Sequence, residues 1–284
     1  MNLLSQIDLD DLLQRAIAED VGQGDITTAA TVAANQPGRA TITVKESGSI
    51  IFCGGPILTQ VFQLTGARPQ AELLAAEGSR LRQGEIAAKI EGMLAGLLNG
   101  ERVALNFVQL MSGIATATRR YVDAVAGTGA KIVDTRKTHP GLRAIEKYAV
   151  RCGGGSNHRF GLDSGVLIKD NHIASAGSIR AALERAHAVA PHTFRVEIEC
   201  ETLAQVEEAV ANGAATILLD NMPIADLQRA RAIVGDGVLL EASGGITLES
   251  VRAIAETGVD LISVGALTHS PKAVDLSMRI EATL

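Results

Sequence analysis

The feature that most constrains this chain is a repeated strand and helix unit in its second half. From residue 131 onward, short apolar runs that end in a polar or charged residue alternate with amphipathic segments, and the later runs begin about 22 residues apart. Parallel strands need a crossover of about this length, usually a helix, so the spacing predicts a parallel sheet. The expected strands are residues 131–134, 166–170, 194–199, 216–220, 239–243 and 261–264. The expected crossover helices are residues 178–190, 203–212, 224–234 and 248–257.

Such units build either a closed β/α barrel or an open doubly wound sheet. The sequence favours the barrel, because no G-x-G-x-x-G follows the first strand. Polar residues instead collect at the C-terminal end of every expected strand, which is where a barrel carries its active site.

The residues before about 110 have a different pattern, which predicts an α+β domain. Residues 38–46 and 49–53 alternate as strands do, residues 56–64 form a short helix, and residues 77–86 indicate a hairpin-rich β unit. Residues 97–125 then carry apolar side chains at helical spacing, so a long helix is expected to bridge the two parts.

Composition excludes several classes of protein. The chain has 284 residues, of which 46% are hydrophobic and 20% charged, so it is expected to be globular. Aromatic residues make up only 2% and the net charge is -6, which argues against nucleic acid as a partner. No apolar run is long enough to span a membrane, and residues 1–20 lack the basic start of a signal peptide. Three cysteines without a C-x-x-C pair are expected to be reduced, which fits a cytoplasmic protein.

Positive charge is concentrated between residues 131 and 172. This segment holds eight Lys and Arg residues against four acids, and three of the six histidines. A solvated basic face is the usual meaning of such a run. Here, however, Arg136, Lys137 and Lys169 stand at or just past strand ends, where side chains of a barrel converge. The pattern therefore predicts a pocket for a polyanion, with arginine suited to carboxylate or phosphate groups.

Carboxylates follow in the second half of the barrel. Glu197, Glu199 and Glu201 alternate along one strand and share a face, while Asp220 and Glu241 end the next two strands. If that face points inward, Glu199 and Asp220 meet near the barrel mouth. Two roles remain open for them: ligands of Mg²⁺, which favours carboxylates, waters and substrate phosphates, or acceptors for ribose hydroxyls. The histidine spacing fits no zinc pattern.

Small residues after the last two strands indicate phosphate binding. Ser243-Gly244-Gly245-Ile246 and Ser263-Val264-Gly265-Ala266 would let backbone N–H groups approach an anion. Glycines that serve only as turns are the alternative explanation. A cationic half and a carboxylate half at one barrel mouth suggest two substrates: a phosphorylated sugar with its metal, and an anionic acid.

A family resemblance rests on an ordered set of motifs that covers nearly the whole chain. These motifs are Glu19-Asp20, Gly24-Asp25-Ile26-Thr27, Asp134-Thr135-Arg136-Lys137-Thr138, Pro140-Gly141-Leu142-Arg143, Gly153-Gly154-Gly155, Asn157-His158-Arg159, Leu167-Ile168-Lys169-Asp170-Asn171-His172, Leu218-Leu219-Asp220-Asn221-Met222 and Glu241-Ala242-Ser243-Gly244-Gly245-Ile246. In this order they resemble the quinolinate phosphoribosyltransferases, also called carboxylating nicotinate-nucleotide pyrophosphorylases.

The resemblance implies an activity and an architecture. The expected reaction converts quinolinate and phosphoribosyl pyrophosphate to nicotinate mononucleotide, pyrophosphate and CO2, with Mg²⁺, in de novo NAD synthesis. The expected architecture is an N-terminal α/β domain over residues 1–110, joined by a C-terminal helix over residues 271–284, beside an incomplete TIM-like α/β barrel with parallel strands over residues 111–270. An obligate homodimer is also implied, in which Arg102 enters the neighbouring subunit's site.

The resemblance also assigns roles to individual residues. Substrate binding falls to Arg102, Thr135, Arg136, Lys137, His158, Arg159, Lys169, Glu199, Asp220, Ser243, Gly244, Gly245, Ser263, Val264 and Gly265. Within this set, quinolinate is expected on the arginines and His158, phosphate oxygens on the two small-residue loops, and ribose and metal on Glu199 and Asp220. Lys137, Lys169, Glu199 and Asp220 are the expected catalytic residues, with Lys137 or Lys169 stabilising the ring anion that decarboxylation leaves.

Three other functions compete with this one. A relative found in molybdate-transport operons shares the architecture, but the run of Arg136, His158 and Arg159 favours a dicarboxylate substrate. A barrel aldolase would form a Schiff base through Lys169, because such enzymes place their lysine at a strand end. A sensor of anionic metabolites is the non-enzymatic alternative.

Overall fold

The computed structural model describes residues 9–282. Residues 1–8, which open the N-terminal stretch considered above, and residues 283–284, which end the segment expected to be helical, lie outside the described part. The chain forms two compact units, which are described separately. Among the described residues, unit 1 comprises residues 9–119, 139–154 and 270–282, and unit 2 comprises residues 120–138 and 155–269. Within the described residues, no helix is both long and apolar enough to cross a membrane.

Unit 1 is built on a four-stranded antiparallel sheet with the order β12-β1-β5-β3. The strands are β1 (Pro37–Val44), β3 (Gln70–Leu73), β5 (Ile86–Met93) and β12 (Leu276–Ala282). Along β1, alternate residues are buried, with Ala40, Ile42 and Val44 fully so. Alternation of this kind places one face of a sheet on a hydrophobic core and leaves the other face polar.

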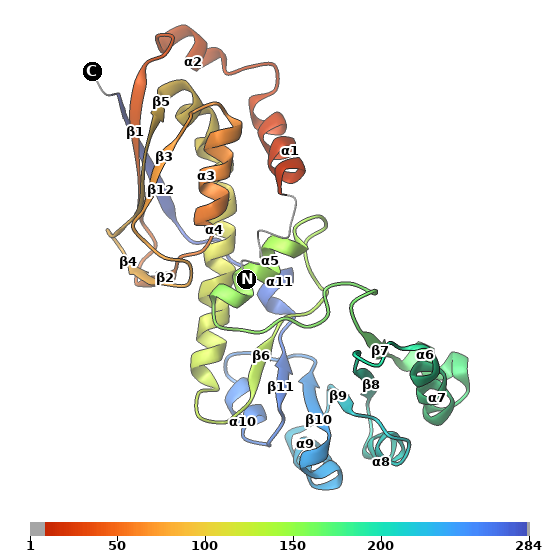
Figure 1. Cartoon of the computed structure of the whole chain (residues 1–284). Helices are drawn as coiled ribbons and strands as arrows, with labels where there is room; N and C mark the ends of the chain where they lie inside the picture. The colour runs from red at the N-terminus through yellow and green to blue at the C-terminus, as the bar shows by residue number, and fades with distance from the viewer. Residues whose placement is uncertain (1–8, 283–284) are drawn as a thin grey trace. The chain divides into compact units, whose positions relative to one another are not determined.

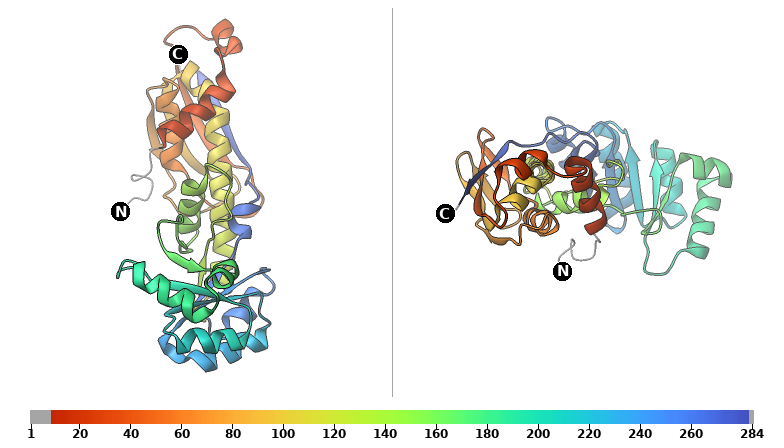
Figure 2. Two further views of the ribbon diagram at one scale, coloured as in Figure 1. Left: turned by 90° about the vertical axis from the view of Figure 1, so that its right-hand side faces the viewer. Right: turned by 90° about the horizontal axis from the view of Figure 1, so that it is seen from above.

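Helices pack beside this sheet. Unit 1 contains α1 (Asp10–Val21), α2 (Ile26–Thr31), α3 (Gly55–Leu64), α5 (Arg143–Cys152) and the part of α4 (Leu94–Ala124) up to residue 119. Figures 1 and 2 show α3 and α4 side by side. Gly100 permits this close approach, since a Cβ there would lie 2.9 Å from the ring of Phe62, a fully buried side chain of α3.

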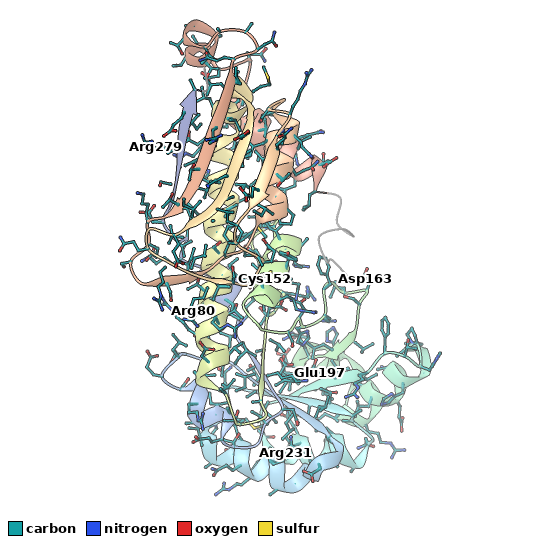
Figure 3. The ribbon with its side chains drawn as sticks, turned by 60° about the vertical axis from the view of Figure 1, so that its left-hand side comes forward. Arg80, Cys152, Asp163, Glu197, Arg231 and Arg279 are labelled. Atoms are coloured by element: carbon teal, nitrogen blue, oxygen red, sulfur yellow. The ribbon has the colours of Figure 1, made fainter. Side chains whose placement is uncertain are left out.

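The C-terminal segment is a strand, so the helix expected over residues 271–284 is wrong within the described part. β12 pairs antiparallel with β1 over seven residue pairs, from Gly38 with Ala282 to Val44 with Leu276. As an edge strand it presents an exposed arginine, Arg279, whose side chain is labelled in Figure 3. Charged side chains on an edge discourage pairing with further strands.

The β unit expected over residues 77–86 also differs in its pairing. β4 (Arg80–Arg82) pairs with β2 (Ser49–Ile51) in a separate two-stranded ribbon, whereas β5 joins the four-stranded sheet. The boundary between the units falls within α4, near residue 119 rather than 110, and α5 belongs to unit 1.

Unit 2 contains the six parallel strands that the sequence predicts, in the order β6-β11-β10-β9-β8-β7. The strands are β6 (Lys131–Val133), β7 (Val166–Ile168), β8 (Val196–Cys200), β9 (Thr216–Asp220), β10 (Leu239–Ser243) and β11 (Leu261–Ser263). They are connected by α6 (Asp170–Ala176), α7 (Ile179–Val189), α8 (Leu203–Ala211), α9 (Ile224–Val234), the 3₁₀ turn η2 (Gly235–Gly237) and α10 (Val251–Ala255), and β11 is followed by α11 (Ala266–His269). Figure 1 shows α7, α8 and α9 succeeding one another along the sheet.

The sheet of unit 2 is an incomplete barrel, as expected. β6 and β7 lie at its two edges. The segment that connects them runs past the end of β6, where Val133 forms a parallel bridge with Ser156. Because all six strands are parallel, their C-terminal ends meet at one end of the unit.

Candidate active site

A cavity of about 620 Å³ opens at the C-terminal ends of the unit 2 strands, and we call it the upper pocket. It is lined by Thr135, Arg136, Lys137, His158, Arg159, Leu162, Leu167, Lys169, His172, Glu199, Leu218, Asp220, Asn221, Glu241, Ser243, Gly244, Gly245 and Ser263. The structure therefore brings together every expected substrate-binding residue except Arg102, Val264 and Gly265.

The cationic side of the upper pocket comes from the segments after β6 and β7. Buried Asp134 fixes the first of these segments, because it accepts hydrogen bonds from the His158 backbone N–H at 2.9 Å and from the Asn157 amide at 2.5 Å. Arg159 then follows, and its Nη1 donates to the carbonyl of Gly165 at 2.9 Å. Burial, reinforced by the nearby Arg136, lowers the pKa of Arg159. A guanidinium group whose charge is disfavoured by burial and by a neighbouring cation is prepared to bind an anion.

The acidic side comes from β8 and β9. Glu199 lines the pocket and its Oε2 pairs with Lys169 Nζ at 2.5 Å. Asp220 ends β9 and accepts a hydrogen bond from the Asn221 amide at 3.0 Å. Glu201 follows β8, is exposed and does not line the pocket. Among the three glutamates on this face, Glu199 is the one at the upper pocket.

The loop after β10 has the geometry of an anion site. Gly244 and Gly245 have φ angles of 94° and 58°, which favour glycine. Within residues 9–282, the backbone N–H groups of these two glycines donate to no protein acceptor. The loop does not enter a helix directly, because α10 begins only at Val251. Free N–H groups in a turn nonetheless suit a phosphate.

The loop after β11 fits this role less well. Val264 is buried and its N–H already donates to the Val133 carbonyl at 3.0 Å, so it is engaged in the sheet. Gly265 does not line the pocket but lies next to it. A Cβ at Gly265 would lie 3.1 Å from the side chain of Lys137, which does line the pocket. Of Ser263, Val264 and Gly265, only Ser263, the last residue of β11, lines the upper pocket.

A second cavity, of about 760 Å³, lies toward the other end of the same strands, and we call it the lower cavity. Its lining includes Lys131, Thr216, Leu239 and Leu261, which are the first residues of their strands. Three residues line both cavities and thus form the floor of the upper pocket: His158, Arg159 and Glu241. Burial and the neighbouring Glu197 carboxylate raise the pKa of Glu241 to about 7.

Arg102 belongs to a different part of the chain. It is an exposed residue of α4 in unit 1 and does not line the upper pocket.

Two polar residues of the pocket, His172 and Asn221, stand in the quoted motifs but were not predicted as site residues. The ring of His172 accepts a hydrogen bond from the Lys169 backbone N–H at 2.9 Å, which holds the lysine's backbone. Asn221 has a positive φ of 53° and packs on Gly244 while it orients Asp220. An asparagine directly after a strand-ending aspartate, where left-handed backbone is common for asparagine, was the available signal.

A pocket with a cationic and an acidic side, at the carboxyl ends of a parallel α/β barrel, defines a barrel enzyme that acts on anionic substrates. Comparison with known proteins identifies the family. The sequence profile of the quinolinate phosphoribosyl transferase C-terminal domain matches residues 114–279, and that of the N-terminal domain matches residues 25–112. The chain belongs to the quinolinate phosphoribosyl transferase family.

Similar proteins span nearly the full length of this chain. A probable nicotinate-nucleotide pyrophosphorylase [carboxylating] of Bacillus subtilis is 46% identical over 277 residues, covering 98% of this chain and 95% of its own. The nicotinate-nucleotide pyrophosphorylase [carboxylating] of Mycobacterium leprae is 45% identical, covering 97% and 99%. The crystal structure of NadC from Streptococcus pyogenes has a TM-score of 0.92 at 40% identity, covering 97% of both chains.

Proposed function

We infer that this chain transfers the phosphoribosyl group of phosphoribosyl pyrophosphate to quinolinate and releases CO2, giving nicotinate mononucleotide and pyrophosphate for NAD synthesis. The observation that carries this inference is the upper pocket, whose cationic and acidic sides face each other in a chain of this family. A planar dicarboxylate needs the cationic side. A phosphorylated sugar that develops positive charge at its anomeric carbon needs the acidic side.

Quinolinate binds on the cationic side in this proposal. The guanidinium groups of Arg136 and Arg159 offer paired N–H donors that match carboxylate geometry, and Lys137 adds a point charge. Leu162 and Leu167 also line the pocket and provide apolar surface for the pyridine ring. With its carboxylates held there, the ring nitrogen would face the acidic side, where the ribose is placed.

Phosphoribosyl pyrophosphate binds on the acidic side and at the loop after β10. The N–H groups of Gly244 and Gly245 and the hydroxyl of Ser243 are donors for phosphate oxygens, and Asp220 and Glu199 are acceptors for ribose hydroxyls. These two carboxylates also fit Mg²⁺, which takes oxygen ligands and keeps several waters. Since Glu199 is already paired with Lys169, Asp220 is the better protein ligand. When bound, Mg²⁺ would neutralise charge on the departing pyrophosphate.

Transfer proceeds as the pyridine nitrogen forms a bond to the anomeric carbon and the bond to the pyrophosphate oxygen breaks, with both electrons leaving on pyrophosphate. The ring, now a pyridinium, then loses its adjacent carboxylate as CO2, and the electron pair of that bond stays on the ring carbon until a proton replaces it. We assign the stabilisation of this anion to Lys137. Within residues 9–282 no carboxylate pairs with Lys137, whereas Lys169 is held by Glu199.

The active form in this proposal is a homodimer. Arg102 is exposed on α4 and lines no part of the upper pocket, so it is available to a neighbouring subunit. In the dimer it would add a further cation for the quinolinate carboxylates.

The test is a comparison of two acceptors. Purified protein is supplied with phosphoribosyl pyrophosphate and Mg²⁺, together with quinolinate in one cuvette and nicotinate in another, and absorbance and CO2 release are followed. Consumption of quinolinate with release of CO2, and no consumption of nicotinate, is the expected result. Absence of turnover with quinolinate overturns the assignment. Lys137→Ala is expected to reduce kcat more than it raises the KM for quinolinate.

A further inference from the structure

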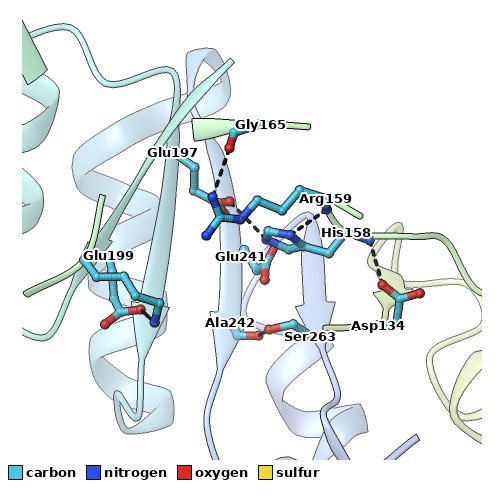
Figure 4. A network of polar contacts seen from close by, with 10 residues as sticks. Asp134, His158, Arg159, Gly165, Glu197, Glu199, Glu241, Ala242 and Ser263 are labelled. Atoms are coloured by element: carbon cyan, nitrogen blue, oxygen red, sulfur yellow. Dashed lines mark hydrogen bonds and ion pairs between the residues drawn. The ribbon is translucent and has the colours of Figure 1, made fainter. Parts of the chain in front are cut away.

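The floor of the upper pocket contains a histidine surrounded by buried carboxylates. Nε2 of His158 lies 3.1 Å from Oε2 of Glu197 and 3.7 Å from Oε2 of Glu241. Glu197 is 8% exposed and Glu241 is 1% exposed. Figure 4 shows the His158 ring close to both carboxylates, with the main chain of Arg159 near its other nitrogen.

The second ring nitrogen fixes the proton on the first. Nδ1 of His158 accepts a hydrogen bond from the backbone N–H of Arg159 at 2.7 Å. A backbone amide can only donate, so Nδ1 must present its lone pair and carries no proton. The ring is therefore neutral with its proton on Nε2, and this N–H faces Glu197 at hydrogen-bond distance, whereas Glu241 lies farther away.

The same hydrogen bond argues against a metal ion among these three residues. Their ligand atoms all lie within 4.8 Å of one another, which is close enough for a metal. A metal at Nε2 needs the lone pair there, so the ring proton would have to move to Nδ1. The Arg159 N–H already occupies that position. A proton between Nε2 of His158 and the Glu197 carboxylate satisfies this geometry, and a metal ion does not.

The main chain around His158 is equally constrained. Its backbone N–H donates to Asp134 at 2.9 Å, and Arg159, the next residue, extends its side chain to the Gly165 carbonyl. The imidazole ring of His158 therefore links the buried Glu197 carboxylate, through Nε2, to the backbone amide of Arg159, through Nδ1. The Arg159 side chain lines the upper pocket. Neither ring nitrogen is left to bind a substrate carboxylate.

We propose that Glu197 is a positioning residue: its carboxylate accepts the Nε2–H of His158, and Nδ1, left with its lone pair, accepts the Arg159 N–H, so the ring fixes Arg159. On this basis the positive charge that receives quinolinate comes from the arginines and lysines alone, and His158 contributes none. This inference rests on the proposed function for its substrate, but the state of the ring is a property of the free protein.

The first experiment observes the ring directly. Protein labelled with ¹⁵N-histidine is studied by NMR without substrate at pH 7.5, and His158→Asn identifies the signals of His158. The expected result is an unprotonated Nδ1 and a protonated Nε2. A protonated Nδ1, in either the other tautomer or the imidazolium, overturns the proposal. Because no substrate is present, this result is independent of the reaction assigned to the protein.

The second experiment separates hydrogen bonding from charge. Glu197→Gln keeps an acceptor for the Nε2–H, and Glu197→Ala removes it. The Ala variant is expected to raise the KM for quinolinate about tenfold, equivalent to about 1.4 kcal/mol, with a smaller change in kcat. The Gln variant is expected to stay within about twofold of the unchanged protein. Equal impairment of both variants would show that the negative charge, and not the hydrogen bond, is required, and the proposal would then be wrong.

A matched control comes from the same cavity. Thr216 is buried, lines the lower cavity with Glu197, and is replaced by valine with little change of shape. Thr216→Val is expected to leave the KM for quinolinate unchanged. If it raises this KM as much as Glu197→Ala does, the effect is one of packing, which also overturns the proposal. If the protein turns over no quinolinate while the ring has the expected tautomer, the substrate assignment fails and the positioning of His158 stands.

Discussion

At the scale of single residues, the loop after β10 depends on the absence of one side chain. Gly244 has a φ of 94°, and a Cβ at this position would lie 2.1 Å from Oδ1 of Asn221. The Asn221 amide in turn donates to Asp220, so the glycine lets these three residues pack together between the loop after β10 and the acidic side of the pocket. Both the backbone conformation and the close approach require glycine here.

Gly244→Ala should therefore impair the binding of phosphoribosyl pyrophosphate. The substitution displaces Asn221 and strains the backbone by about 1–2 kcal/mol. We therefore expect the KM for phosphoribosyl pyrophosphate, measured by initial rates, to rise about tenfold or more. Gly213→Ala is the matched control, since Gly213 has a similar φ of 80° but no atom within 4 Å of the added Cβ. It carries the backbone strain without the collision, and equal effects of the two variants would contradict this explanation.

Glu241 is expected to make stability depend on pH. Burial and Glu197 raise its pKa to about 7, above that of an unfolded glutamate, so the folded state keeps this proton to higher pH than the unfolded state does. The free energy of unfolding should then fall as pH rises from about 4.5 to about 7. Glu241→Gln removes this dependence, so its free energy of unfolding should rise relative to that of the unchanged protein by about 3 kcal/mol over that interval.

Urea unfolding at a series of pH values measures this difference. Thr216→Val, a buried substitution in the same cavity without a titrating group, should follow the unchanged protein at every pH. Parallel curves for Glu241→Gln and the unchanged protein would show that Glu241 does not retain its proton in the fold.

The three glutamates of β8 show what single residues of a sequence can predict. Alternation correctly indicates that Glu197 and Glu199 share a face, because side chains of a strand repeat every two residues. It cannot show depth along the strand, since a slip by two residues preserves the pattern. The structure supplies the depth: Glu197 lies below the floor, Glu199 pairs with Lys169, and Glu201 is exposed.

At the scale of elements, the start of α3 is held by a glutamate distant in sequence. The carboxylate of Glu77 accepts backbone N–H groups of Gly54 at 3.1 Å and of Gly55 at 2.8 Å. It also accepts a longer contact of 3.7 Å from the thiol of Cys152, which Figure 3 labels at the end of α5. A negative charge on unpaired N–H groups stabilises the first turn of a helix.

Glu77→Ala should accordingly weaken unit 1 by about 1–2 kcal/mol. Amide hydrogen exchange is the sharpest measurement, because faster exchange is expected first within α3. Glu72→Ala changes an exposed glutamate of β3 in the same unit and should leave the exchange of α3 unaltered. Undisturbed protection of α3 in Glu77→Ala would mean that this cap is dispensable.

Sequence periodicity predicted the parallel strands of unit 2 closely, and β9, β10 and α9 have the expected limits. Each of these elements is contacted mainly by its neighbours in sequence, so local pattern carries most of the information. β12 was expected to be a helix, although Leu276, Met278 and Ile280 alternate as in a strand. Its partner β1 lies more than two hundred residues away, and no local signal identifies such a partner.

At the scale of the whole molecule, the proposed dimer predicts that two inactive variants restore each other. Arg102→Ala lacks the residue that would enter the neighbouring site, and Lys137→Ala lacks a residue of its own site. In a mixed dimer, the Arg102→Ala subunit keeps its Lys137 and receives Arg102 from its partner, so one of the two sites is intact. Random reassociation of equal amounts should therefore give about one quarter of full activity, since about half of the dimers are mixed.

The measurement is made on subunits that carry two different tags. Mixed dimers isolated through both tags should have about half the activity of the unchanged dimer, because one site in each pair is complete. Each variant taken alone through the same unfolding and refolding steps is the control and should remain inactive. If Arg102 served its own subunit, or if the chain acted as a monomer, neither site in the mixture would be complete and no activity would return. Recovery therefore depends on an arginine that crosses from one subunit to the other.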